Sequence, residues 1–323
     1  MNIDMKIAKD FSRLSSRGVF GKALNEITNK NDNIMAVVAD VMTSAKLEDF
    51  YKNYPEKLVN VGIAEQNMIS IASGLASEGY NVFATTFAPF ASMRCFEQIR
   101  TQVGYMNLNV KIIGILSGLG GGVVGNTHWG LEDLAIMRTI PNMTVISPAD
   151  CVETYKTIEA LKDFNGPCYV RLTGVNGTPC VYKEDYNFEI GKSIVMQEGE
   201  DIAIIATGTM VYESLRASKA LKKQGINAKV INMHTIKPLD TKALDEVFKN
   251  YKFIVTVEEH FKIGGLGGAV AEYKSTLKNA PRHLIIGIED KFEKAGDYNF
   301  MLNKTGLNAP QIAQKILEVY KGE

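Results

Sequence analysis

The sequence has no long apolar run, no basic block and few cysteines. No segment of its 323 residues approaches the roughly 20 uninterrupted apolar residues that span a bilayer, and the N-terminus lacks the apolar core of a secretion signal. Lys plus Arg and Asp plus Glu are both 36, which argues against nucleic acid as the main partner. We therefore expect a cytoplasmic protein with neither a membrane nor a nucleic acid as its partner.

Metal-ligating residues are also scarce. None of the four cysteines stands in C-x-x-C spacing, and the four histidines are dispersed. This pattern favours neither a zinc site nor a disulfide framework, so we expect no metal in this chain and thiols that are buried or neutral. The residues in question are Cys95, Cys151, Cys168, Cys180, His128, His234, His260 and His283.

What the sequence has in abundance is alternation between short apolar runs and helix-periodic segments. Runs such as 34–39, 81–86 and 110–116 have the length and composition of buried strands, and helical patterns follow them. This alternation predicts an α/β protein with two domains, each a mostly parallel sheet flanked by helices. We place the first domain at 1–175, an irregular linker at 176–190 and the second domain at 191–323.

One carboxylate opens an otherwise apolar segment. Glu65 precedes a run with no charge until Glu78, which predicts a helix buried around most of its circumference. In the first turn of that helix, free backbone N–H groups and the helix dipole favour a negative charge. Glu65 either completes this helix start or belongs to a site.

Other polar and aromatic residues follow predicted strands. Asp40 and Ser44 come after the strand at 34–39, and Phe87 and Phe90 flank Pro89 after the next strand. In an open α/β sheet, ligands bind at the carboxyl ends of strands, so all four residues are candidates for a site. The alternative for Asp40 and Ser44 is a polar turn, and the alternative for the two phenylalanines is core packing.

Two glycine-rich loops also follow predicted strands. Residues 120–125 satisfy G-x-G-x-x-G, but His128 and its polar neighbours follow in place of an apolar helix. We expect this loop to let backbone approach a ligand, and not to bind a nicotinamide dinucleotide. For the glycines at 264–268 we expect close packing of a helix start on a strand, with phosphate binding as the alternative.

In combination these features resemble a known family. The sequence is similar to the pyrimidine-binding and C-terminal domains of transketolase, a thiamine-diphosphate enzyme, over nearly the whole chain. The matching runs are Gly62-Ile63-Ala64-Glu65-Gln66-Asn67, Thr86-Phe87-Ala88-Pro89-Phe90, Thr127-His128, the segment 141–150 and Val257-Glu258-Glu259-His260.

The resemblance implies roles for individual residues. Glu65 would hydrogen-bond a ring nitrogen of the cofactor's aminopyrimidine, Phe87 and Phe90 would line that ring, and Asp40 would lie near it. His128 would contact the substrate and assist its proton transfers.

Substrate recognition is implied in the same way. Arg17 and Arg171 would clamp an anionic group, with Ser44 beside them, since a fork of donors suits a phosphate. Val124 and Leu116 replace a sugar-reading Asp and a second His of ordinary transketolases, which puts the usual pentose phosphates in doubt. The anionic group could be a phosphate, a sulfonate or another acid.

An entire domain of the family pattern is missing. Transketolases hold the diphosphate through Mg²⁺ and a Gly-Asp-Gly…Asn motif, and this chain contains no Gly-Asp-Gly. The resemblance therefore implies the second half of a split transketolase, which transfers a two-carbon ketol unit from a ketose to an aldose. It would pair with a diphosphate-binding subunit that carries the Mg²⁺, in an α2β2 assembly that also involves self-association of this chain.

Three other functions remain open. The β subunit of a 2-oxoacid dehydrogenase E1 component has a similar layout and a Gly-Ile-Ala-Glu-Gln run. A deoxyxylulose-phosphate-synthase-like activity is a further alternative. A third alternative is a non-catalytic interaction subunit of the same fold, which would be consistent with the apolar residues Val124 and Leu116 at substrate-contacting positions.

Overall fold

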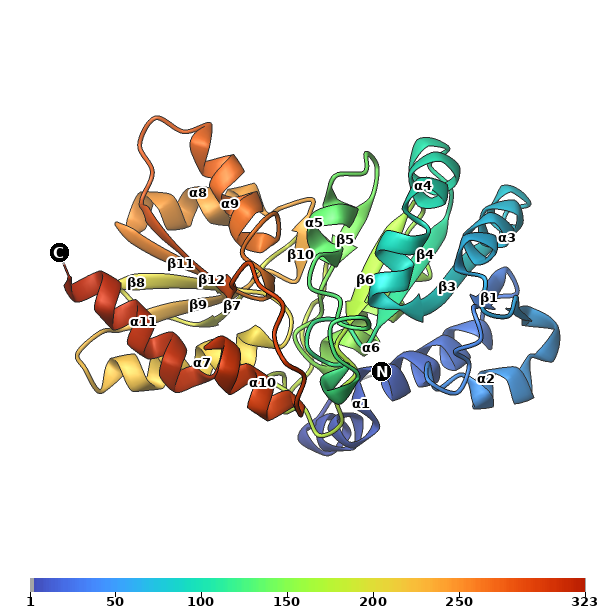
Figure 1. Cartoon of the computed structure of the whole chain (residues 1–323), viewed down its shortest axis with the longest axis horizontal. Coiled ribbons are helices and arrows are strands. Elements are labelled where there is room, and N and C mark those ends of the chain that lie inside the picture. Colours follow the sequence, from blue (N-terminus) through green and yellow to red (C-terminus); the bar gives the residue numbers. More distant parts are fainter. Residues whose placement is uncertain (1–2, 323) are drawn as a thin grey trace.

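The computed structural model describes residues 3–322. It has two lobes that lie side by side, each built on a mainly parallel sheet with helices on both faces (Figure 1). The predicted fold class is therefore confirmed. The stretch 173–193 between the lobes contains no helix or strand.

The first sheet has seven strands in the order β10-β5-β6-β4-β3-β1-β2. All neighbouring pairs are parallel except β10 with β5. Every residue of β4 and β6 is buried, as expected for central strands covered on both faces. The strands are β1 (Ile34–Val38), β2 (Leu58–Asn60), β3 (Asn81–Phe87), β4 (Val110–Ile115), β5 (Thr144–Ile146), β6 (Cys168–Leu172) and β10 (Thr235–Lys237).

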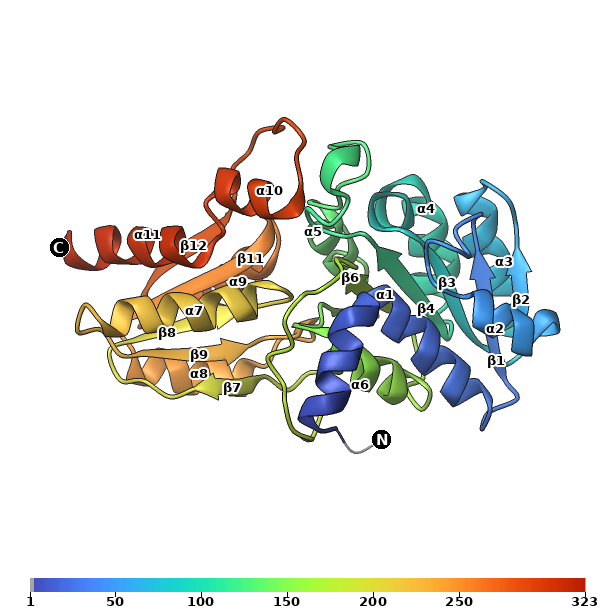
Figure 2. The ribbon, with the colours of Figure 1, turned by 90° about the horizontal axis from the view of Figure 1, so that it is seen from below.

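Helices α1 (Met5–Thr28) and α6 (Cys151–Leu161) pack together on one face of this sheet (Figure 2). Helix α1 is kinked at Ser15, whose φ of 66° is outside the helical region. Helices α2 (Glu48–Asn53), α3 (Glu65–Ser77) and α5 (Asp133–Arg138) also belong to the first lobe.

Two helical predictions need correction. Helix α3 is fully buried on one face only, through Met68, Ile69 and Ala72 among others, and its other positions are half-buried or exposed. The helix predicted after β3 is interrupted by π-helical turns at Phe90–Arg94 and Ile99–Tyr105, on either side of α4 (Phe96–Gln98). Because a π turn changes the angular spacing of side chains, Met93 in the first of these turns is 40% exposed.

The second sheet has the order β12-β11-β8-β9-β7, with only the edge strand β7 antiparallel. Apolar residues of α7 and α11 pack in one core, and those of α8 and α9 in another. The strands are β7 (Ile194–Gln197), β8 (Ile202–Ala206), β9 (Ala228–Asn232), β11 (Phe253–Phe261) and β12 (Arg282–Ile288). The helices are α7 (Met210–Lys222), α8 (Thr241–Asn250), α9 (Leu266–Ser275), α10 (Tyr298–Thr305) and α11 (Ala309–Lys321).

Strand β10 ties the lobes together. It follows β9 in the chain but pairs antiparallel with β5, so a segment of the second lobe forms the edge of the first sheet. Lys237 at its end donates from Nζ to the carbonyl oxygen of Arg138, 3.1 Å away. The sequence did not predict this strand, because three residues give too short an alternation to be distinguished from a loop.

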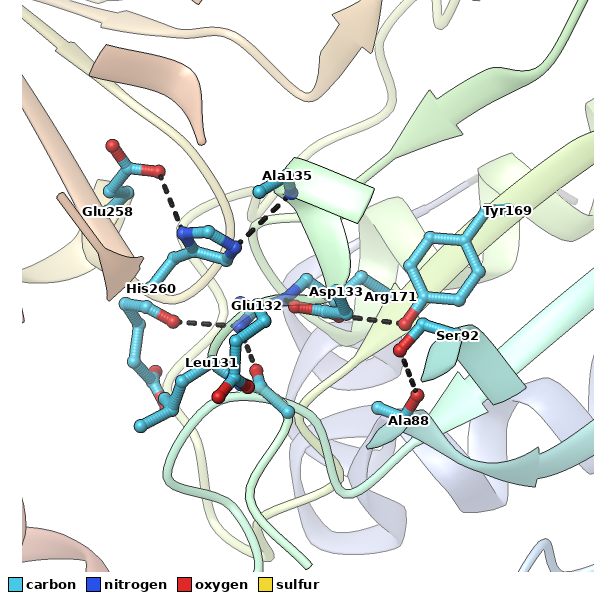
Figure 3. Close-up of polar contacts among 12 residues, drawn as sticks. Ala88, Ser92, Leu131, Glu132, Asp133, Ala135, Tyr169, Arg171, Glu258 and His260 are labelled. Carbon is cyan, nitrogen blue, oxygen red and sulfur yellow. Dashed lines mark hydrogen bonds and ion pairs between the residues drawn. The ribbon is translucent and has the colours of Figure 1, made fainter. Parts of the chain in front are cut away.

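A buried histidine joins β11 to α5 (Figure 3). His260 Nδ1 donates to the carbonyl oxygen of Phe261 at 2.6 Å, and its Nε2 accepts from the backbone N–H of Ala135 at 3.3 Å. Only a neutral imidazole can donate at one nitrogen and accept at the other. Burial lowers the pKa of His260 to about 4.

Acidification is therefore expected to weaken the contact between the lobes. The folded-state pKa of His260 lies below its usual value. The stability contributed by the neutral imidazole is therefore complete above about pH 6.5 and is lost as the pH falls toward 4. Replacing His260 by Gln keeps a hydrogen-bonding side chain and removes the titration. Urea unfolding between pH 7 and pH 5 should show a shallower loss of stability for His260→Gln, by at most about 1.4 kcal/mol per pH unit. Equal pH slopes for the two proteins would contradict this role.

Candidate functional site

Several of the predicted site residues meet at the carboxyl ends of parallel strands in the first lobe. Glu65 is the first residue of α3 and is only 4% exposed. The N-cap of α3, Ala64, offers no side-chain hydrogen bond, so the carboxylate lies beside free backbone donors at the helix start. A buried carboxylate placed in this way needs a partner.

Two phenylalanines and a histidine form an aromatic cluster beside Glu65. Phe87 ends β3, Phe90 opens the following helical segment, and their ring centroids lie 6.0 Å apart in an edge-to-face arrangement. The imidazole of His128 lies edge-on to both rings, with centroids at 5.7 Å from Phe87 and 5.3 Å from Phe90. The structure thus brings together two predicted ring-lining residues and the predicted substrate-contacting histidine.

Arg94 completes this cluster and was not among the predicted site residues. Its Nη1 donates to Glu65 Oε1 at 2.7 Å. Its guanidinium carbon lies 4.0 Å from the centroid of the Phe90 ring. A planar, cationic group of N–H donors therefore bridges the carboxylate and an aromatic face.

This donor set fits the aminopyrimidine that the resemblance implied. Such a ring needs a carboxyl oxygen for its nitrogen and an aromatic surface for its face, and Glu65 and Phe90 present both. The guanidinium that bridges them demonstrates that one planar group with N–H donors can satisfy both at once.

The glycine-rich loop carries His128 and is anchored to the second lobe. The Leu119 N–H donates to Glu259 Oε1 at 2.6 Å, and Trp129 Nε1 donates to the Gly122 carbonyl oxygen at 3.0 Å. A Cβ on Gly118 would lie 2.3 Å from Glu259 Oε1. Gly118 therefore lies against a carboxylate of the same chain, and the expectation that the backbone of residues 120–125 approaches a ligand stays a prediction.

The second glycine-rich loop also serves packing, as expected. Glu258 accepts hydrogen bonds from the first backbone N–H groups of α9, from Leu266 at 2.7 Å and from Gly267 at 2.8 Å. A Cβ on Gly265 would overlap the same carboxylate, at 1.9 Å from Oε2. Glu258 therefore takes the place that a phosphate would need.

Arg17 and Ser44 form a separate group. Arg17 donates from Nη1 to the Ser44 carbonyl oxygen at 2.9 Å and from Nε to the Gly174 carbonyl oxygen at 3.2 Å. Gly174 has a φ of 73°, and a Cβ there would lie 2.8 Å from the Arg17 side chain. Burial lowers the pKa of Arg17. The predicted neighbours Arg17 and Ser44 are thus adjacent, through the backbone of Ser44.

The guanidinium of Arg171 faces Asp133 (Figure 3). Its side chain is 3% exposed, its Nε donates to Asp133 Oδ2 at 2.9 Å, and its Nη2 donates to the carbonyl oxygens of Gly130 and Glu259. This geometry contradicts the predicted substrate contact, because the guanidinium is enclosed and engaged by protein oxygens. Both members of this buried ion pair belong to the first lobe, and the Nη2 donation to Glu259 of β11 connects them to the second lobe, so the guanidinium has a structural role.

Three other predicted positions lie near the strand ends. Asp40 follows β1 with a φ of 57° and is exposed, and its N–H donates to Asn60 Oδ1 at 3.1 Å. Val124 is 52% exposed in the glycine-rich loop, while Leu116 is half-buried with a φ of 52°. Asn60 itself was missed, although it also accepts from the Gly62 N–H and so connects β1 to the entry of α3.

All four cysteines are free thiols, and Cys95, Cys151 and Cys168 are buried. Burial raises the pKa of Cys95 and of Cys168 to about 12, so these thiols are neutral as expected. Among residues 3–322, no group of three or more His, Cys, Asp or Glu side chains is arranged to hold a metal ion. No helix in the same range has the length and apolar character needed to cross a bilayer.

Comparison with known proteins identifies the fold. A family model of the transketolase pyrimidine-binding domain matches residues 12–177, and a model of the transketolase C-terminal domain matches residues 191–312. The chain belongs to the transketolase family. The family resemblance inferred from the sequence is therefore confirmed.

Two relatives of this transketolase-family chain have similar lengths. It is 44% identical to a putative transketolase C-terminal section of Methanocaldococcus jannaschii, covering 94% of this chain and 96% of the relative. It is 37% identical to one subunit of the apulose-4-phosphate transketolase of Phocaeicola vulgatus, covering 95% and 98%.

A solved structure is also similar. It is described as a split gene transketolase, inactive beta4 tetramer, and superposes with a TM-score of 0.85 at 39% identity, covering 94% of this chain and 97% of that one.

The structural role of Arg171 can be tested without any ligand. Replacing Arg171 by Gln leaves Asp133 buried without its cation, which should lower the free energy of unfolding of the isolated chain by about 3–5 kcal/mol. The matched control is Arg100→Gln, since Arg100 forms an exposed pair with Glu97 and should change stability little. Urea unfolding measures both, and an unchanged midpoint for Arg171→Gln would contradict this structural role.

Proposed function

We propose that this chain is the pyrimidine-binding subunit of a two-subunit transketolase that uses thiamine diphosphate. The observation that carries the proposal is the cluster of Glu65, Phe90 and His128 at the carboxyl ends of the strands. The proposed domains are 1–175 for pyrimidine binding and 191–323 for the C-terminal domain, joined by a linker at 176–190.

The cofactor, when bound, supplies the carbanion-stabilising chemistry of ketol transfer. Glu65 would share a proton with a ring nitrogen through its carboxyl group, and Phe90 and Phe87 would hold the ring by their apolar surfaces. Asp40 would border the same ring. His128 would exchange protons with substrate oxygens, with its Nδ1 held 2.9 Å from Thr127 Oγ1.

The substrate proposed is a ketose that carries an anionic group, with an aldose as acceptor. Arg17 and the neighbouring Ser44 provide the cationic and polar surface of this chain toward such a group. The Phocaeicola vulgatus relative, whose name gives a sugar phosphate as substrate, supports this class. The apolar side chain of exposed Val124 favours a sugar that differs from ordinary pentose phosphates.

A second polypeptide is proposed to hold the diphosphate and its Mg²⁺. The sequence contains no Gly-Asp-Gly, and two of the similar proteins are named as a section and as a subunit of a transketolase. The similar solved structure is described as an inactive beta4 tetramer of a split gene transketolase. We propose an α2β2 assembly in which two copies of this chain and two partner subunits share the cofactor sites.

Reconstitution tests this proposal. The purified chain with thiamine diphosphate, Mg²⁺, a ketose donor and an aldose acceptor should give no two-carbon transfer. Addition of a chain that carries Gly-Asp-Gly followed by Asn should produce it. The donor panel should contain phosphorylated, sulfonated and uncharged ketoses. Full activity of the isolated chain would contradict the two-subunit proposal, and pyruvate-dependent dye reduction without ketol transfer would favour a 2-oxoacid dehydrogenase.

The role of Glu65 is tested in the reconstituted complex. Glu65→Gln keeps the shape and removes the shared proton, so ketol transfer should fall by at least about 100-fold, the lower bound for loss of a general acid–base group. The matched control is Glu78→Gln at the far end of the same helix, where the side chain is exposed. Undiminished turnover of Glu65→Gln would exclude the proposed mechanism.

A further inference from the structure

Arg94 makes the two contacts that the proposed cofactor ring requires. Its Nη1 is 2.7 Å from Glu65 Oε1, and its guanidinium carbon is 4.0 Å from the Phe90 ring centroid. These contacts come from different elements, since Glu65 opens α3 while Phe90 and Arg94 bracket the π-helical turn after β3. One side chain therefore spans the space between the carboxylate and the aromatic face.

The two partners of this ion pair differ in exposure. The Glu65 side chain is 5% exposed and the Arg94 side chain is 47% exposed. Glu65 is fixed in the protein, whereas the guanidinium can turn outward into water without a large desolvation change. Arg94 is thus a replaceable partner for a carboxylate that cannot move away.

A guanidinium and an aminopyrimidine can make the same contacts with Glu65 and Phe90. Both are flat, delocalised groups that donate N–H hydrogen bonds and stack on aromatic rings. At 4.0 Å the guanidinium already covers its face of Phe90, so no second planar group fits between them. Glu65 Oε1 already accepts from Arg94, so a ring that lies on this face of Phe90 and bonds to the same oxygen takes the place of the guanidinium.

We propose that Arg94 occupies the aminopyrimidine subsite in the free subunit and that the cofactor must displace it. The proposal rests on the proposed function and adds that a side chain of this protein competes with the cofactor's aminopyrimidine. Arg94 keeps the buried Glu65 charge compensated until the cofactor ring arrives, and it weakens apparent cofactor affinity by the cost of breaking its two contacts.

Binding measurements on the reconstituted complex test this competition. Calorimetric titration with thiamine diphosphate should give an Arg94→Gln complex that binds about 3- to 30-fold more tightly than the wild type, the factor expected for an exposed ion pair plus a cation–π contact. Arg94→Lys, which keeps the charge without a planar face, should lie between the two. Arg100→Gln, an exposed arginine from the same helical region, should bind like the wild type.

A fragment of the cofactor shows whether the change in affinity arises at the pyrimidine ring. A thiazole diphosphate that lacks the pyrimidine should bind the wild-type and Arg94→Gln complexes equally, because Arg94 competes only with the ring. Equal tightening of the fragment and the whole cofactor would overturn the proposal, as would equal or weaker binding of thiamine diphosphate to Arg94→Gln.

A measurement on the isolated chain needs no cofactor. In a cycle of Arg94→Gln, Glu65→Gln and the double variant, the shifts in urea midpoint should be non-additive, since the two groups form one ion pair. Additive shifts would overturn the resident contact itself. Failure of the wild-type complex to bind thiamine diphosphate would overturn the proposed function together with this proposal, whereas an unchanged Arg94→Gln would overturn this proposal alone.

Discussion

The Asp133–Arg171 ion pair lies where the two lobes meet, and the surroundings of the site depend on it. Asp133 is fully buried and accepts from Arg171 Nε and from the Tyr169 hydroxyl at 2.7 Å. The other end of the guanidinium donates to the backbone of the glycine-rich loop at Gly130 and to that of β11 at Glu259. Two desolvated charges are tolerated here because protein donors and acceptors satisfy both of them.

Glu259 extends this connection to the loop that carries His128. Its carboxylate accepts from the Leu119 N–H at 2.6 Å and from the Tyr298 hydroxyl at 2.6 Å, and Thr209 also donates to it. Burial raises the pKa of Glu259, although hydrogen bonds from three elements oppose this shift. The loop is therefore held by the second lobe. In contrast, the Glu65–Arg94 contact is half-exposed and is the part of the site that can rearrange.

Local patterns were sufficient to predict the buried strands and the start of α3 at Glu65, whereas the family and the role of the aromatic pair came from the resemblance of short motifs to transketolase. Long-range contacts were not accessible in this way. Arg171 stands at the end of a predicted strand, where an arginine can contact a ligand. Its ion-pair partner Asp133 lies 38 positions earlier in the sequence, so the local pattern did not reveal the pair. Arg94 was not among the predicted site residues, because helical periodicity does not reveal the π turn that directs its side chain over Phe90. Strand β10 pairs with β5 of the other lobe, and its three residues are too few for an alternating pattern to predict a strand.

The central claim is that this chain holds one end of a cofactor whose other end belongs to a second polypeptide. Calorimetric titration of thiamine diphosphate with Mg²⁺ into this chain, the partner chain and their equimolar mixture tests it most directly. We predict saturable binding by the mixture that is at least about tenfold tighter than binding by either chain alone, because the two sets of contacts act on one molecule. Binding by the isolated chain as tight as that of the mixture would contradict the account.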